Sequence, residues 1–148
     1  MNISIFLNRL FFSDIQEGLA IALFFWYNKV MKQTFKINYK LDNWNTIIGR
    51  CRTNKYYANS HKQKEMEIIK YSLIGLHKIE KYPIEIEFRW HIKSSISDLD
   101  NKSVKSILDE LQKQEIIEND NIKYINKITH YAIKDKEEYV EVTLIDGN

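Results

Sequence analysis

The sequence contains very little cysteine, proline and glycine: one Cys, one Pro and four Gly among 148 residues. The single cysteine, Cys51, excludes a disulfide within the chain and a cysteine-rich zinc cluster, so a reducing, cytoplasmic setting is expected. The scarcity of proline and glycine predicts few sharp turns, and the chain has no glycine-rich phosphate-binding loop. The apolar run 19–27 has nine residues, too few to cross a bilayer, so no membrane role is expected.

With 44% apolar and 28% charged residues, the chain has the size and composition of one globular domain. Its net charge of +2 hides an asymmetry. Residues 31–82 hold 11 Lys and Arg against 4 Asp and Glu, whereas residues 83–148 hold 9 against 14. A basic half beside an acidic half predicts a polyanion-binding surface next to a cluster that attracts cations. Two solvated faces of opposite sign are the alternative.

Residues 1–30 differ from the rest, because they are mostly apolar and carry two positive and two negative charges. We interpret them as an N-terminal extension outside a core domain of residues 31–148, since Met31 opens a regular amphipathic pattern. The alternative is an additional helix that packs on the domain.

The hydrophobic periodicity of residues 31–148 predicts an α/β fold in the order β-α-β-α-β-β, with a mixed four-stranded sheet and two main helices. The second strand has the clearest period-two signal of the chain. The polar and aromatic segment 42–57 is expected to be irregular. The expected strands are 31–41, 84–92, 122–133 and 139–145, and the expected helices are 59–81 and 101–112.

Three aspartates form the strongest candidate for chemistry. Asp98 and Asp100 follow the second strand two residues apart, so an extended backbone points both carboxylates the same way. An extended segment 115–120 after the second helix would return Asp120 to the same end of the sheet. Three carboxylates together repel one another, and a bound hard cation relieves that repulsion, so we expect a Mg²⁺ site.

Such a site activates water and neutralises charge that develops on a phosphodiester, and two metal ions would clamp both the attacking and the leaving oxygen. Lys105, one turn into the second helix, would stabilise the phosphorus centre or the leaving oxygen, with Lys102 as the weaker candidate. The structural alternative is that Asp100 or Asn101 caps the helix, Asp120 makes a turn, and Lys105 is a solvated surface residue.

A basic and aromatic segment precedes the first expected helix and continues into it. Cations next to flat rings suit phosphate contacts and stacking on branched or partly unstacked nucleic acid. The candidate DNA-binding residues are Arg50, Arg52, Lys55, Tyr56, Lys62 and Lys64, with Tyr57 and Lys70 beside them.

Four features occur in an order that resembles RusA-type Holliday-junction resolvases, often carried by phages. They are the Asp-Leu-Asp-Asn run 98–101, Lys105, the helix end 107–111, and the acidic segment 116–121. The resemblance covers residues 31 to about 146. Two details depart from the family pattern: Asn119 replaces the first of two adjacent acids, and Lys105 follows Asp100 by five residues, where some members have four.

The resemblance implies a RusA-like fold and a homodimeric, Mg²⁺-dependent endonuclease that cuts four-way DNA junctions by paired, symmetric incisions in recombination and repair. Carried over by residue, Asp98, Asp100 and Asp120 would bind the metal and Lys105 would be the catalytic lysine. Near two-fold symmetry of a junction suits a two-fold dimer with two acidic sites. The stripe of Phe88 and Trp90 and the final hairpin are candidates for the dimer face, although a place in the core suits them better.

Two other functions fit the same sequence. One is a DNA-binding protein without catalysis, in which the acids only cap helices and make turns. The other is a nuclease that acts on flaps, duplex or RNA and uses the same residues.

Overall fold

The computed structural model describes Gly18, residues 31–94 and residues 98–147. Residues 31–147 form one compact unit. The interpretation of residues 1–30 as an extension falls, apart from Gly18, outside the described residues.

The sheet has four strands in the spatial order β1-β4-β2-β3. β4 runs antiparallel to both β1 and β2, whereas β2 and β3 are parallel, so the prediction of a mixed four-stranded sheet is confirmed. The strands are β1 (Lys32–Ile37), β2 (Ile84–Ile92), β3 (Ile125–Lys134) and β4 (Tyr139–Ile145). Two of them, β2 and β4, have the predicted bounds. In β2, buried and half-buried side chains alternate strictly along the strand, as the period-two pattern predicts.

The described residues contain three helices, α2 (Trp44–Thr53), α3 (Lys55–Ser72) and α4 (Lys105–Lys113), where two were predicted. The expectation of an irregular segment 42–57 was wrong. Asn43 accepts a hydrogen bond from the amide of Thr46, and Asn54 accepts from the amides of Tyr56 and Tyr57, so each Asn caps the helix that follows it. None of the residues of α2 is buried, and a helix without a buried face has no apolar stripe to reveal it.

The helix expected at 59–81 begins earlier and ends earlier, because α3 stops at Ser72 and Gly75 adopts a positive φ of 90° soon after. The helix expected at 101–112 begins four residues later than predicted. Its N-cap is Val104, which makes no side-chain cap, so neither Asp100 nor Asn101 caps it.

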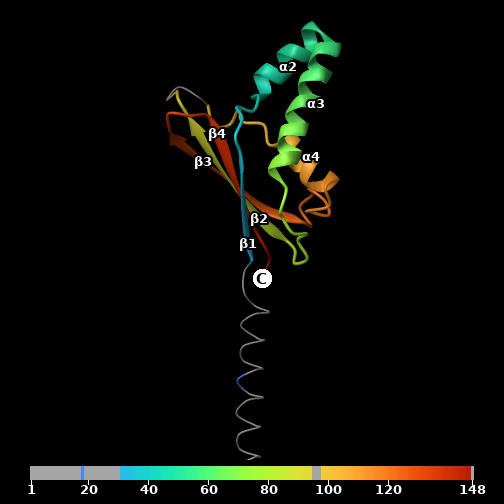
Figure 1. The fold of residues 1–148 in the computed structure, drawn as a ribbon, viewed down its shortest axis with the longest axis vertical. Helices are drawn as coiled ribbons and strands as arrows, with labels where there is room; N and C mark the ends of the chain where they lie inside the picture. The colour runs from blue at the N-terminus through green and yellow to red at the C-terminus, as the bar shows by residue number, and fades with distance from the viewer. Residues whose placement is uncertain (1–17, 19–30, 95–97, 148) are drawn as a thin grey trace, which may run out of the picture. The chain divides into compact units, whose positions relative to one another are not determined.

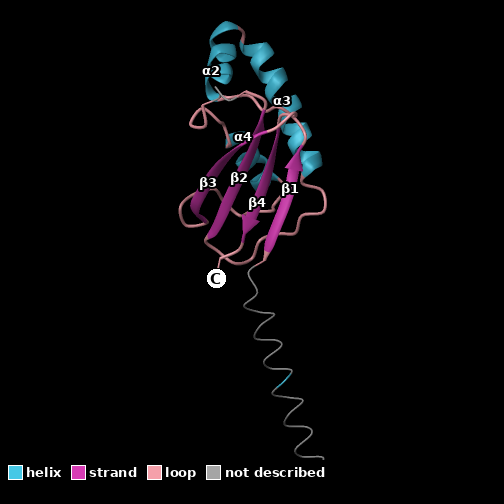
Figure 2. Ribbon diagram, turned by 90° about the vertical axis from the view of Figure 1, so that its left-hand side faces the viewer, coloured by secondary structure: helices cyan, strands magenta, loops and turns pink. Residues whose placement is uncertain are grey.

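The helices α3 and α4 cover one face of the sheet (Figures 1 and 2). The core lies between these layers. Phe88 and Trp90, the candidates for a dimer face, are 0% and 4% exposed and belong to this core. Other fully buried members are Ile37, Ile69, Ile79, Ile84, Ile86, Ile107, Leu111, Val140, Val142 and Leu144.

Candidate nucleic-acid site

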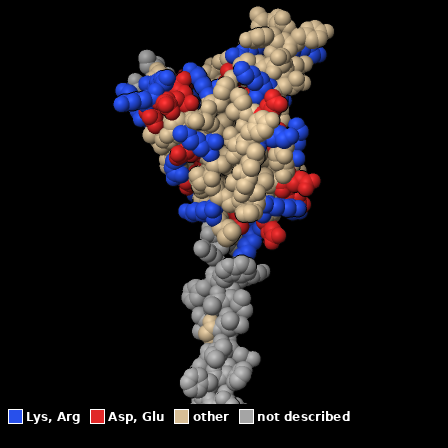
Figure 3. All heavy atoms as spheres, viewed as in Figure 1, with Lys and Arg blue, Asp and Glu red and all other residues tan. Residues whose placement is uncertain are grey.

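The helical hairpin of α2 and the first half of α3, residues 43–64, is called the arm below. Figures 1 and 2 show that it extends past the end of the sheet. Between Asp42 and Glu65 the chain carries five Lys and Arg and no Asp or Glu. On the face seen in Figure 3, the outer part of the arm presents basic and uncharged side chains. The arm is therefore a basic projection with little apolar support from the core.

Most of the candidate DNA-binding side chains are exposed on the arm. Tyr56 is 89% exposed, and Tyr57 beside it is 58% exposed. The exposed cations are Arg52, Lys55, Lys62 and Lys64. Arg50 differs, because its guanidinium forms an ion pair with the half-buried carboxylate of Asp42. It therefore holds the arm in place instead of standing free for phosphate.

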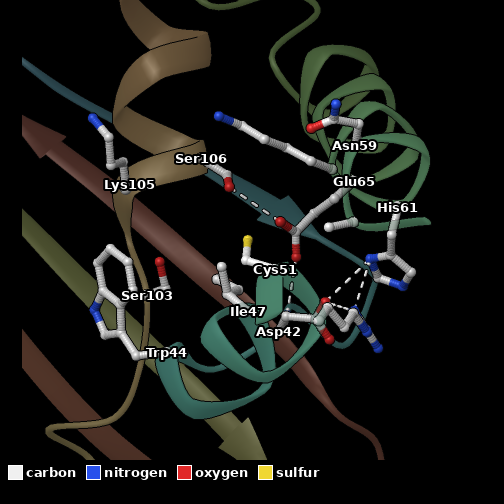
Figure 4. Close-up of a pocket in the computed structure, with 13 residues that line it drawn as sticks. Asp42, Trp44, Ile47, Cys51, Asn59, His61, Glu65, Ser103, Lys105 and Ser106 are labelled. Atoms are coloured by element: carbon white, nitrogen blue, oxygen red, sulfur yellow. Dashed lines mark hydrogen bonds and ion pairs between the residues drawn. The ribbon is translucent and has the colours of Figure 1, made fainter. Parts of the chain in front are cut away.

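The root of the arm contains a polar network that joins the segment before α2 to α2, α3 and α4 (Figure 4). His61 Nδ1 lies 3.0 Å from the Arg50 guanidinium and 3.1 Å from Asp42 Oδ2. Glu65 is 5% exposed, and its two oxygens accept the Asp42 amide at 3.0 Å and the Ser106 hydroxyl at 3.1 Å. Since a buried carboxylate requires hydrogen-bond donors, Glu65 fixes α3 against both α4 and the segment before α2.

Sequence reasoning missed Glu65, although a signal was present. It lies four residues before Ile69 and eight before Leu73, which places a carboxylate on the buried face of the helix. A charge at such a position indicates a partnered, structural or functional group.

Asp98 and Asp100 lie in the loop after β2, called the acidic loop below (residues 98–101). Both aspartates are exposed, whereas Leu99 between them packs against the core. The two carboxylates are therefore presented to solvent by one anchored turn, whereas an extended backbone was predicted for this segment.

Asn101 connects the acidic loop to the arm. Its carbonyl accepts the Trp44 amide at 3.0 Å, and its side-chain Oδ1 accepts the Asn45 amide at 3.2 Å. These are the first two amides of α2, which have no partner within their own helix. Asn101 was expected to cap α4, but it satisfies the start of α2 instead, so the acidic loop and the basic arm are held side by side.

The two candidate lysines differ in environment. Lys105 is exposed and its Nζ lies 3.1 Å from Asp109 Oδ1, one turn further along α4. Lys102 is half-buried, with its ammonium 5.6 Å from the Trp90 ring centroid. Burial lowers the pKa of Lys102 from its usual 10.5, and Glu138 opposes that effect. Lys105 is the more exposed of the two, and its ammonium is paired with Asp109.

Asp120 does not join the other two aspartates. β2 and β3 are parallel, and Ile84 pairs with Ile125 where the two strands begin. Asp120 precedes β3 and lies near the start of β2, where the Glu118 amide donates to the Tyr82 hydroxyl at 2.9 Å. Asp98 follows the end of β2, and the nine residues of that strand rise roughly 30 Å at 3.3 Å each.

The expected cluster of three carboxylates within one chain was therefore wrong. The predicted return along segment 115–120 fails because this segment turns, with Glu115 at a φ of 58°, instead of extending. In the part of the chain that the structure describes, no group of three or more His, Cys, Asp or Glu side chains is placed to hold a metal ion. Two carboxylates are still enough for Mg²⁺, which is usually bound through one or two carboxylates, waters and substrate phosphates.

His130 of β3 contacts Trp90 near the end of β2. The Trp90 indole donates to His130 Nδ1 at 2.9 Å, and their rings stack. Burial lowers the pKa of His130 from 6.5, which is consistent with a neutral imidazole that accepts a hydrogen bond.

A comparison with models of known protein families and a comparison with curated proteins both give no match for this chain. Among the described residues, no helix has the length and hydrophobicity needed to span a membrane.

Proposed function

We propose that this protein is a Mg²⁺-dependent endodeoxyribonuclease that resolves four-way DNA junctions by paired, symmetric cuts. The observation that carries the proposal is the attachment of the acidic loop to the basic arm through Asn101. DNA held by cations and rings of the arm would lie next to two exposed carboxylates. The resemblance of segment 98–121 to RusA-type resolvases supports the choice of reaction and substrate.

In this proposal Asp98 and Asp100 hold Mg²⁺ together with oxygens of the DNA phosphate. When bound, Mg²⁺ neutralises charge on the phosphodiester and lowers the pKa of water. The exposed ammonium of Lys105 stabilises negative charge at the phosphorus centre or on the leaving oxygen. Arg52 and Lys55 contact phosphates, and Tyr56 offers its ring to unstacked bases.

Paired cuts require two acidic sites, and a two-fold homodimer on a nearly two-fold junction supplies them. Sedimentation of the protein with and without junction DNA tests this part of the proposal. A monomer that binds one per junction would contradict it.

The test of the reaction is cleavage of an end-labelled four-way junction, with matched linear duplex and flap DNA, in Mg²⁺ or in EDTA. We expect paired nicks on the junction only, lost in EDTA and in Asp100→Asn. Cleavage that EDTA does not affect would contradict the metal site. Equal cleavage of every substrate would keep the chemistry but reject junction resolution in favour of a nuclease with another specificity.

A second candidate function is junction binding without cleavage. The observation that favours it is the distance of Asp120 from Asp98 and Asp100, which leaves only two carboxylates together in one chain. In that case Asp98→Asn would bind the junction as tightly as the unmodified protein, and neither would cut it.

A further inference from the structure

A cavity of about 170 Å³ lies at the root of the arm, between α2, α3 and the start of α4. Its wall on one side is the indole of Trp44, which is 40% exposed. Ile47 and Cys51 line it from the same helix, and Figure 4 shows Trp44 and Glu65 on opposite sides of the space. A cavity of roughly 150 Å³ accommodates benzene, so this one has room for one six-membered ring.

Two polar groups that line the cavity, Ser103 and Glu65, can form further hydrogen bonds. The Ser103 hydroxyl is buried and has no hydrogen-bond partner. Each oxygen of Glu65 accepts one hydrogen bond from the protein, whereas a carboxylate has about four acceptor positions. The cavity therefore offers acceptors and one hydroxyl to a flat ligand that carries N–H groups.

The edge of the cavity is cationic. Lys62 from α3 and Lys105 from α4 both line it, and both are exposed. An aromatic wall, polar acceptors inside and ammonium groups at the mouth suit a nucleobase that is attached to phosphate. Ser103 follows Asp100 by only three residues, so a base in the cavity would have its phosphate near the acidic loop.

We propose that this cavity binds one unstacked, single-ring nucleobase of the DNA substrate, between Trp44 and the polar groups of Glu65 and Ser103. The proposal rests on the proposed function, since it assigns a place to a base of the same nucleic acid. Removing a base from the stack costs least where it is already unpaired or poorly stacked, and the branch point of a junction interrupts the stacking of its base pairs. A free pyrimidine nucleotide shares this chemistry and is the other source to be tested.

Cys51 provides a direct reporter, because it is the only cysteine of the chain, is exposed and lines the cavity. The experiment measures the rate at which iodoacetamide alkylates Cys51 in the full chain. The added ligands are a duplex with one bulged pyrimidine, the same duplex with an abasic bulge, and a pyrimidine nucleoside monophosphate. The abasic duplex controls for shielding by DNA that lies only on the arm.

We expect the bulged pyrimidine to slow alkylation about tenfold more than the abasic bulge, since a stacked base contributes strongly to binding. Equal protection by both duplexes, with both shifted in a gel, would overturn the base site and leave DNA binding intact. If neither these duplexes nor a four-way junction shifts in the gel, the proposed function fails as well. Protection by the free nucleotide at the concentration at which the bulged duplex protects would overturn DNA as the source.

Ser103→Ala gives a second measurement. Because its hydroxyl has no partner in the protein, its removal should leave the fold and binding of the abasic duplex unchanged. We expect the preference for the bulged pyrimidine over the abasic bulge to fall severalfold, whereas Ser60→Ala on the exposed surface of α3 leaves it unchanged. An unaltered preference in Ser103→Ala would contradict the role of Ser103.

Discussion

At the scale of single residues, the chemistry of the proposed site depends on where three aspartates lie. Asp98 and Asp100 are presented by one turn that Leu99 anchors in the core. Asp120 lies near the start of β2, at the other end of the sheet from the acidic loop. The three carboxylates, which appear equivalent in sequence, are therefore expected to differ in their effect on cleavage.

Replacing Asp98 or Asp100 with Asn is expected to lower Mg²⁺-dependent junction cleavage at least about 100-fold, because even outer-shell partners of a metal are worth up to that much. Asp120→Asn, a substitution of the same kind, is expected to leave cleavage within about twofold, since Asp120 cannot reach the same metal ion within the chain. The measurement is the single-turnover cleavage rate at saturating protein. A loss in Asp120→Asn as large as that in Asp100→Asn would show that Asp120 does contribute to the site.

His130 gives a pH dependence with a defined sign. Burial lowers its pKa below 6.5, so below that pH the unfolded chain takes up a proton that the folded protein does not. The contribution of His130 to the free energy of unfolding is therefore fully present above about pH 6.5 and is lost as the pH falls below it. The urea midpoint measured between about pH 8 and pH 5 should show this decrease.

His130→Gln, which has no titrating group and retains a hydrogen-bond acceptor for Trp90, should reduce that pH dependence. His77→Gln, the same substitution at an exposed position, is the matched control. An unchanged slope in His130→Gln would mean that other groups cause the acid sensitivity.

At the scale of elements, the arm depends on contacts that lie outside its own helices. α2 has no buried residue, so hydrophobic packing contributes little to holding it. Its first amides bond to Asn101, and Arg50 in its last turn pairs with Asp42. The helix was missed in the sequence for the same reason, because its stability comes from caps and ion pairs and not from an apolar stripe.

Asn101→Ala removes one of these contacts, and its expected cost is about 0.5–2 kcal/mol, as for loss of a helix N-cap. Hydrogen exchange at the Asn45 amide should become faster, and the urea midpoint should fall. Asn126→Ala, at an exposed position of β3, should change neither. Unaltered exchange at Asn45 in Asn101→Ala would contradict the proposed link between loop and arm.

The arm also predicts a salt dependence of DNA binding. Each phosphate that a cation neutralises on duplex DNA contributes about 0.9 to the slope of log affinity against log salt. The double variant Arg52→Gln, Lys55→Gln should therefore lower the slope by about 1.8, measured by fluorescence anisotropy over a range of salt. Lys78→Gln, an exposed lysine in the loop before β2, should leave the slope unchanged. A flat salt dependence of the unmodified protein would contradict phosphate binding by the arm.

At the scale of the whole molecule, residues 31–147 form one compact unit with its own core. A protein fragment of these residues is therefore expected to fold without the first 30. Its circular dichroism and melting temperature should match those of the full chain, apart from the signal of the missing residues. An insoluble or unfolded fragment would show that residues 1–30 belong to the domain.

The fold class and the bounds of β2 and β4 follow from the sequence alone. These are the properties that local alternation of apolar and polar side chains encodes, since a half-buried strand needs a period of two. The sequence also shows that residues 43–64 are basic and that Asp98 and Asp100 lie two positions apart after β2. Both statements depend only on residues close together in the chain.

Which distant residues meet depends on the packing of the whole domain. The parallel register of β2 and β3 places Asp120 away from Asp98, and no local pattern specifies that register. The bonding of Asn101 to α2 instead of α4, and the cavity between Trp44, Glu65 and Ser103, join segments that are far apart in the sequence. Such contacts depend on how packed layers align, and hydrophobic periodicity specifies only the face that each element buries.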